Sequence, residues 1–227
     1  MKASPPSSSI LCAPSGVSAL RTTILASGGG TNVQTVIDAV AEGSLDLDLR
    51  AVIANRSDAY ALERARQAGV PAIELVWDRK TTSRDAYDDR LVDLVAKTRP
   101  DLVLLLGWMH VLPVRFIERF EAILNIHPAY LPVDPSADEV DMPDGSRIPA
   151  FRGAHAVADA LAAGVKWYGT SVHRVRYEID RGEILERRAL PLRAKTPDDA
   201  IQALRPAERE VLRAALRRYC DRLNFKA

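Results

Sequence analysis

Residues 101–107, with the sequence DLVLLLG, form a nearly unbroken apolar run in a chain of which 27% is charged. A strand without alternation of polar and apolar side chains is typical of a parallel sheet that is covered on both faces. Shorter apolar segments are predicted as further strands, at residues 22–27, 49–55, 72–76 and 122–126. The chain is therefore expected to build a sheet with helices on both sides.

Helical patterns separate these strands. In residues 31–40 one helical face is apolar, formed by Val33, Val36, Ile37 and Val40. Ser83 is predicted to cap a helix that extends to residue 98, because a serine side chain can accept a hydrogen bond from a free N–H at a helix start. Further helices are expected at residues 59–69 and 113–120. This alternation predicts an α/β fold with a doubly wound, mostly parallel, Rossmann-like sheet.

The pattern changes after residue 132. Residues 133–149 are polar, acidic and rich in turn formers, so a surface loop is expected there. A helix is expected at residues 154–164, followed by two strands at 168–177 and 183–192 that the turn EIDRG joins in antiparallel fashion. From Thr196 the chain is helical by pattern, with an apolar face of Val211, Leu212, Ala215, Leu216 and Tyr219. Pro206 is predicted to break this stretch or to begin a new helix.

Length and composition limit the class of protein. The 227 residues suit a single α/β domain over residues 21–227, after a Ser- and Pro-rich extension at 1–20 that we expect to be disordered. A net charge of +1 gives no drive toward nucleic acid, and no apolar run approaches the roughly 18 residues that span a bilayer. Cys12, Cys220 and the four histidines lack the spacing of a disulfide framework or a zinc site, so we expect a cytoplasmic protein without a metal.

A glycine-rich segment, SGGGTN at residues 27–32, lies between the first predicted strand and helix. Glycines allow close approach of the backbone to a ligand, and free N–H groups at a helix start favour an anion. A phosphate site is the first interpretation and a plain tight turn is the second. A dinucleotide fingerprint fits poorly, because the third glycine is missing and Asn55 and Arg56 follow the second strand in place of an acidic residue.

Two polar side chains end the predicted fifth strand, in the sequence NIHPAYLP at residues 125–132. Ligands of a parallel sheet collect beyond the carboxyl ends of its strands, so Asn125 and His127 are expected to share a cleft with the glycine loop. Asp180, in the later turn, could fold over that cleft. Such a trio suits acyl transfer to an amine: the amide stabilises an oxyanion, the imidazolium donates a proton, and the carboxylate raises the imidazole pKa.

Structural roles remain open for each of these residues. A histidine at a strand end can be a hydrogen-bonded structural residue, and an Asp before Arg181–Gly182 can be a simple turn residue. His173 lies in an alternating strand and is interpreted as packing, while His110 and His155 either line the cleft or are exposed.

Several segments resemble a known family in the same order along the chain. They include ILASGGGTNVQTVIDA, SRDAYDDRLVDLV, PDLVLLLGWMHVL, LNIHPAYLP and GTSVHRVRYEIDRGEIL. Together they resemble formyltransferases that use 10-formyltetrahydrofolate. The glycine loop and SRDAYD point to the branch that formylates glycinamide ribonucleotide, the amine N1-(5-phospho-D-ribosyl)glycinamide of purine biosynthesis.

The resemblance implies a role for each matching residue. Gly30, Thr31 and Asn32 would hold the substrate phosphate, and Glu208 would contact the amine substrate. Arg84 would bind the folate, and Met109, His110, Val111 and Leu112 would supply backbone hydrogen bonds to its pteridine. Asn125 would contact the formyl oxygen, His127 would donate a proton, and Asp180 would raise the His127 pKa and order a water. The implied partners are small molecules only, and a homodimer is considered.

The sequence also departs from the family. His110 stands where an Arg is usual, and FRGAH, at residues 151–155, is more similar to formyltransferases that act on transfer RNA or sugars. Residues 133–149 look like an insertion that is either a lid or an inert loop; we favour the inert loop because long surface insertions cost little free energy. Alternative functions are formylation of methionyl-tRNA or an amino sugar, hydrolysis of the formyl-folate, and a nucleotide-binding module without catalysis.

Overall fold

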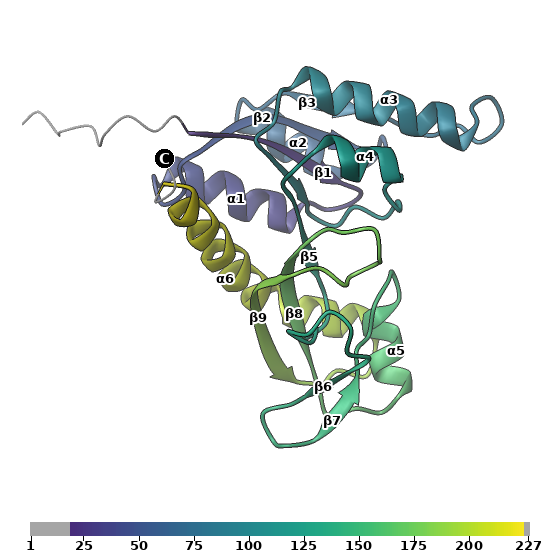
Figure 1. Cartoon of the computed structure of the whole chain (residues 1–227), viewed down its shortest axis with the longest axis vertical. Helices are drawn as coiled ribbons and strands as arrows, with labels where there is room; N and C mark the ends of the chain where they lie inside the picture. Colours follow the sequence, from purple (N-terminus) through teal and green to yellow (C-terminus); the bar gives the residue numbers. More distant parts are fainter. Residues whose placement is uncertain (1–18, 225–227) are drawn as a thin grey trace, which may run out of the picture.

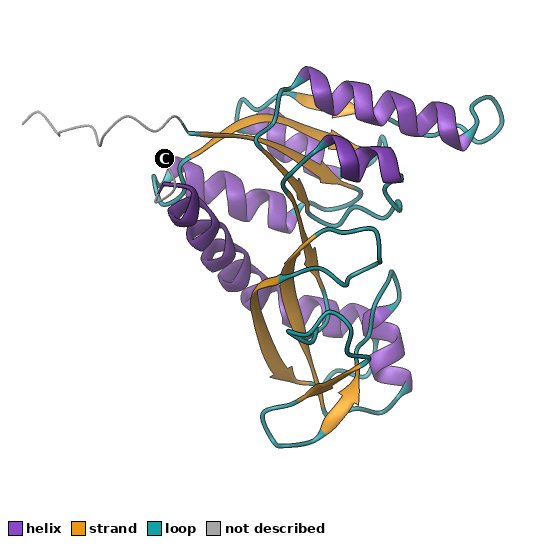
Figure 2. Cartoon of the chain, viewed as in Figure 1, coloured by secondary structure: helices purple, strands orange, loops and turns teal. Residues whose placement is uncertain are grey.

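The computed structural model describes residues 19–224, which form a seven-stranded sheet, a two-stranded sheet and six helices (Figures 1 and 2). The strands are β1 (Leu20–Ala26), β2 (Leu47–Ala54), β3 (Ala72–Glu74), β4 (Leu102–Leu105), β5 (Ile123–His127), β6 (Glu139–Asp141), β7 (Arg147–Pro149), β8 (Trp167–Arg174) and β9 (Ile184–Pro191). The helices are α1 (Thr31–Ala41), α2 (Tyr60–Gln67), α3 (Arg84–Lys97), α4 (Val114–Arg119), α5 (Ala156–Ala162) and α6 (Pro197–Asn224).

The large sheet has the strand order β3-β2-β1-β4-β5-β8-β9. Strands β3 to β5 in this order are parallel, whereas β8 pairs antiparallel with β5 and β9 antiparallel with β8. This confirms the predicted doubly wound sheet with antiparallel strands toward the C-terminus. Between β1 and β4 the order reverses, and in open α/β sheets such a switch point opens a crevice at the carboxyl ends of the strands.

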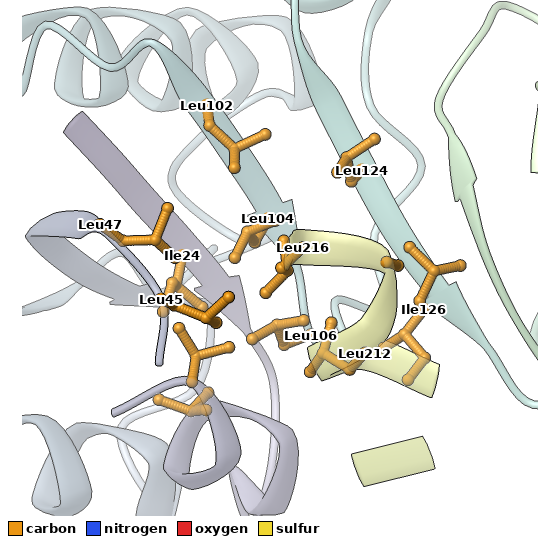
Figure 3. Packing of buried hydrophobic residues seen from close by; sticks show 14 of the residues in the cluster. Ile24, Leu45, Leu47, Leu102, Leu104, Leu106, Leu124, Ile126, Leu212 and Leu216 are labelled. Carbon is orange, nitrogen blue, oxygen red and sulfur yellow. The ribbon is translucent and has the colours of Figure 1, made fainter. Parts of the chain in front are cut away.

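Both faces of the sheet are buried, as the apolar run in β4 predicts. Leu102 and Leu104 belong to a core with α1 and α6, while Val103 and Leu105 belong to a second core with α3 and α4. Figure 3 shows side chains of α6 meeting the first of these faces, with Leu212 and Leu216 beside the strand residues. Burying one leucine fully contributes about 2 kcal/mol, so these two cores fix the sheet that positions the site.

The predicted cap at Ser83 and the predicted apolar face of the last helix are both present. The Ser83 side chain accepts a hydrogen bond from the backbone N–H of Ala86 (3.2 Å), as expected of an N-cap. All five side chains predicted for the apolar face of the last helix are buried. Of the predicted N-terminal extension, residues 1–18 lie outside the described part of the chain, and so does Cys12; β1 already begins at Leu20.

The segment 133–149 lies at the surface as predicted, with most of its residues exposed, but it is not a simple loop. This segment contains β6 and β7, which pair antiparallel and form a hairpin. Its charged side chains hid a strand pattern in which every second residue is apolar: Val140, Met142 and Ile148 are buried in a cluster with Phe151 and Trp167 packed against it. We call residues 133–149 the hairpin segment.

The predicted break at Pro206 is wrong, because α6 continues through it. Proline removes the N–H that would bond to the carbonyl of Gln202, four residues earlier. Gln202 and Pro206 both lie on the exposed side of the helix, where water can take the place of that donor. Packing of the buried face of α6 therefore outweighs the tendency of proline to end a helix. Among residues 19–224, none of the helices combines the length and the apolar character required to cross a membrane.

Candidate active site

A pocket of about 340 Å³ opens at the carboxyl ends of β4 and β5. Its walls come from the segment 107–112 after β4, the end of β5, the turn after β8 and the helix α6. The backbone links these walls to the glycine loop: Ser27 N–H donates to the Gly107 carbonyl (3.0 Å), and Met109 N–H donates to Ser27 Oγ (2.9 Å). The crevice expected where the strand order reverses is therefore present as a cavity. Polar groups from distant parts of the chain line it.

The structure brings Asn125, His127 and Asp180 together in this pocket. His127 Nδ1 lies 3.5 Å from Asp180 Oδ2, and Asn125 Nδ2 lies 3.4 Å from Asp180 Oδ1. His127 Nε2 lies 3.0 Å from the carbonyl oxygen of Phe151. Because a carbonyl and a carboxylate can only accept hydrogen bonds, both ring nitrogens of His127 face acceptors, which is an arrangement that suits an imidazolium.

His173 is a member of this cluster that the sequence analysis missed. Antiparallel pairing of β5 with β8 places it directly opposite Asn125. Its Nε2 lies 3.1 Å from Asn125 Nδ2 and 3.3 Å from Asp180 Oδ1, and its side chain is fully buried. His155, by contrast, is exposed. The signal for His173 was its place on an inward-facing strand position, but which partner it meets depends on strand pairing.

The site favours a charged carboxylate at Asp180. Burial by itself raises the pKa of Asp180, but the hydrogen bond with His173, the charge of His127 and the N–H of Gly153 outweigh it and hold the pKa well below its usual range. Burial lowers the pKa of His127, and Asp180 opposes that effect by raising it. The contribution of Asp180 thus has the predicted sign, whereas the net pKa of His127 lies below its ordinary value.

The turn that carries Asp180 is tightly constrained. Asp180 adopts a left-handed backbone conformation with φ of 52°, which non-glycine residues rarely do. At Gly182 an added Cβ would lie 1.5 Å from the carbonyl oxygen of Arg174, so only glycine fits there. The Asp-x-Gly spacing in the sequence therefore has a steric cause, and it aims the Asp180 side chain into the pocket.

The glycine loop lies at the start of α1. Gly30 is the N-cap with φ of 69°, and a Cβ there would lie 2.6 Å from Cα of Ala61. The first N–H groups of a helix have no partner within it, so they are available to an anion beyond Gly30. Asn32 lines the pocket, and its side chain donates to Glu208 Oε2 (3.2 Å). Glu208 is buried, and burial raises its pKa.

The opposite wall is apolar and comes from the segment after β4. Met109 and Val111 line the pocket with 58% and 63% of their surface accessible, and Leu112 lines it as a buried residue. His110 sits among the rings of Trp77, Tyr87 and Trp108. Within residues 19–224, its Nδ1 is buried without a hydrogen-bond partner.

The chain is similar to known proteins over most of its length. The sequence model of the family described as Formyl transferase matches residues 20–138 and 144–216. The chain belongs to this family.

Individual members of the formyl transferase family are similar over most of their length. Phosphoribosylglycinamide formyltransferase of Escherichia coli (strain K12) is 36% identical over 181 residues, which are 79% of this chain and 77% of that protein. The enzyme of the same name from Haemophilus influenzae is 35% identical over 82% of this chain and 79% of its own. The crystal structure of glycinamide ribonucleotide transformylase 1 from Symbiobacterium toebii superposes with a TM-score of 0.77 at 34% identity, covering 89% of this chain and 88% of that one.

Two of the predicted ligand groups of this formyl transferase lie just outside the pocket wall. Gly30 and Thr31 precede Asn32 but do not line the cavity themselves, and neither does Arg84. Arg84 instead donates from Nε to Asp88 (2.8 Å) and from Nη2 to the Val111 carbonyl. It therefore holds the apolar wall from behind. The family match is interrupted at residues 139–143, which lie in the hairpin segment.

Proposed function

We propose that this protein transfers the formyl group of 10-formyltetrahydrofolate to the amine of N1-(5-phospho-D-ribosyl)glycinamide, a step of de novo purine (IMP) biosynthesis. Membership of the formyl transferase family and the names of the relatives support it. The observation that carries the proposal is the pocket itself: Asn125, His127 and Asp180 share one cavity with Asn32 and Glu208 of the glycine-loop side. The proposed reacting groups thus line the same cavity as Asn32, the last residue of the glycine loop.

The amine substrate binds on the glycine-loop side. Backbone N–H groups of Gly30, Thr31 and Asn32 hold the phosphate at the positive end of α1, where the helix dipole favours an anion and the hydrogen bonds are charge-assisted. Glu208 lies farther into the pocket and accepts from Asn32 (3.2 Å). Its carboxyl group contacts the amide and amine end of the substrate, so that the nucleophile points toward Asn125 and His127.

The formyl donor binds against the apolar wall. Met109, Val111 and Leu112 offer an apolar surface that suits the pteridine ring, and the backbone of residues 109–112 supplies its hydrogen bonds. His110 lines the pocket and also packs against the rings of Trp77, Tyr87 and Trp108, so it supports this wall. Arg84 fixes the same segment through the Val111 carbonyl.

The reaction is a direct transfer. The substrate amine attacks the formyl carbon, a C–N bond forms, and the carbonyl oxygen becomes an oxyanion. The bond from this carbon to N10 of the folate then breaks; the amine loses one proton, and N10 gains one. His127 donates a hydrogen bond and a proton to the oxyanion and takes that proton back when the carbonyl re-forms, while Asp180 holds the imidazolium and orders the water that relays the amine proton to N10.

Asn125 supplies the second oxyanion donor. Its amide nitrogen lies 3.1 Å from His173 Nε2 and donates a long hydrogen bond to Asp180 Oδ1 (3.4 Å). A developing oxyanion is a better acceptor than a distant carboxylate, so exchanging this bond for one to the substrate favours the transition state. His173 stays beside the amide nitrogen and limits the movement of the Asn125 side chain.

A spectrophotometric assay tests the proposal. Purified protein and a formyl-folate are combined with glycinamide ribonucleotide, with methionyl-tRNA, with an amino sugar, or with no acceptor. Loss of the formyl group only with glycinamide ribonucleotide supports the proposed function. Loss without an acceptor identifies a hydrolase, loss with another amine changes the substrate, and no loss in any mixture indicates a binding module.

Gly30→Val is expected to raise KM for glycinamide ribonucleotide about tenfold or more with a smaller effect on kcat. Valine cannot adopt the φ of 69° without strain, and its Cβ would collide with Ala61, so the loop must shift. One hydrogen bond to a charged group is worth roughly 1.5–3 kcal/mol, which is about a tenfold change or more in affinity. Steady-state kinetics at varied substrate concentration measure the effect.

Gly43→Val is the matched control. Gly43 lies at the other end of α1 with φ of 70°, and nothing lies within 4 Å of its Cβ position. It therefore carries the same backbone strain without touching the phosphate site. If both variants leave KM at the value of the native chain, the glycine loop is only a turn.

A further inference from the structure

The hairpin segment is attached firmly to the domain. Val140, Met142 and Ile148 are buried, and Tyr130 and Trp167 pack against them. The Ala150 N–H donates to the Asp138 carbonyl (2.8 Å), which closes the hairpin at its open end. A buried apolar cluster and paired backbone groups hold the hairpin segment in one position. The residues that it contacts are therefore held in place as well.

The chain leaves the hairpin directly into the catalytic cluster. Phe151 O lies 3.0 Å from His127 Nε2, and Gly153 N–H donates to Asp180 Oδ2 (2.8 Å). Between them, Arg152 Nε makes a long contact with the Asp180 carbonyl (3.4 Å). Consecutive residues after β7 thus contact both members of the proposed acid pair.

The start of the hairpin segment gathers acceptors for two guanidinium groups. Arg152 Nη2 donates to the Ala137 carbonyl (2.7 Å), and Arg181 Nη1 donates to the Pro135 carbonyl (2.8 Å). The Asp138 carboxylate lies between both: it accepts from Arg181 Nη2 and lies 3.5 Å from Arg152 Nη1. Arg152 contacts the backbone of Asp180, and Arg181 follows Asp180 directly in the sequence. This network therefore connects the hairpin segment to the Asp180 turn.

The geometry of the network makes it more than a surface ion pair. Isolated exposed pairs contribute little, and the Asp138 side chain is 77% exposed. Only 14% of the Arg152 side chain is exposed, however, and its planar fork meets several acceptors at once. Asp180 also needs such support, because a left-handed conformation at a non-glycine residue persists only where the surroundings fix it.

We propose that Arg152 and Arg181, held by Pro135, Ala137 and Asp138 of the hairpin segment, are positioning residues that keep the Asp180 carboxylate against His127. The hairpin segment is then a working part of the site and not an inert insertion. The kinetic consequence rests on the proposed formyl transfer, whereas the structural consequence can be measured without any substrate.

Arg152→Lys is the main test, because lysine keeps the positive charge but cannot bridge several acceptors as a planar fork. It is expected to lower kcat for formyl transfer about tenfold, since a small misplacement of a catalytic group is costly, and to leave KM for glycinamide ribonucleotide unchanged. NMR hydrogen exchange of the Gly153 amide, which donates to Asp180 Oδ2, is expected to become about tenfold faster as that contact opens. Arg181→Lys and Asp138→Asn should change both quantities in the same direction.

Arg147→Lys is the matched control within the same hairpin. Arg147 is 61% exposed and pairs with Asp141 (2.7 Å), away from the Asp180 turn, so kcat and Gly153 exchange should both stay at the native values. If Arg152→Lys does not fold, Asp138→Asn at its exposed site decides by the same two measurements. The proposal is wrong if the Gly153 amide exchanges at its native rate in the variants. It is also wrong if this amide exchanges faster while kcat keeps its native value. If the protein formylates no amine, Gly153 exchange alone still decides the positioning.

Discussion

Replacing His127 by alanine is expected to lower kcat for formyl transfer by about a hundredfold or more, the scale of a lost acid or oxyanion donor. The imidazole is buried in the pocket with Asp180 at 3.5 Å and a carbonyl at 3.0 Å, so alanine removes both the proton and the directed N–H. A hundredfold loss corresponds to about 2.7 kcal/mol of transition-state stabilisation. Single-turnover kinetics with saturating substrates measure the chemical step without product release.

His127→Gln separates the two roles of the ring. Glutamine keeps an N–H donor near the oxyanion but cannot deliver a proton, so it is expected to recover part of the loss. Affinity for glycinamide ribonucleotide should stay close to native in both variants, because the proposed phosphate loop lies at the start of α1 and does not contain His127. A kcat near the native value in His127→Ala would remove the imidazole from the mechanism.

Much of the fold follows from local patterns in the sequence. The run at 102–105 predicts a strand covered on both faces because no side of it is polar, and the two cores divide these residues in alternation. The position of Asn125 and His127 at a strand end also places them at the ligand edge of a parallel sheet without any knowledge of side-chain packing. These predictions succeed because they depend on period and order along the chain.

Other features depend on contacts that no local pattern encodes. His173 belongs to the site because β8 pairs with β5 in one particular register, and a shift by one residue would turn its side chain to the other face of the sheet. The hairpin segment reads as a loop because its alternate exposed residues are charged, and only packing against Trp167 shows that its apolar residues form a cluster. Pro206 is tolerated because its face of α6 is exposed to solvent. The general preference of proline for helix ends does not depend on which face of the helix it occupies.

Asp180→Asn is expected to lower kcat by about a hundredfold or more while preserving the turn. Asparagine has the same size and tolerates the left-handed backbone conformation, so the change removes charge with little strain. Asp180 raises the pKa of His127 against the effect of burial, and its loss lets that pKa fall further below the ordinary value near 6.5. Fewer imidazolium ions are then present at neutral pH to donate a proton.

The pH dependence of kcat gives this prediction its sign. A proton donor is active below its pKa, so kcat falls as pH rises through that value, and in Asp180→Asn this decline is expected to move to lower pH. Asp93→Asn, at an exposed position of α3, is the control for removing one carboxylate from the chain and should keep the native profile. If the decline in Asp180→Asn stays at the native pH while kcat drops, Asp180 acts through the water relay and not through the pKa of His127. A native kcat together with a native profile would exclude it from catalysis, and its lowered pKa would then reflect only the hydrogen bonds that hold the turn.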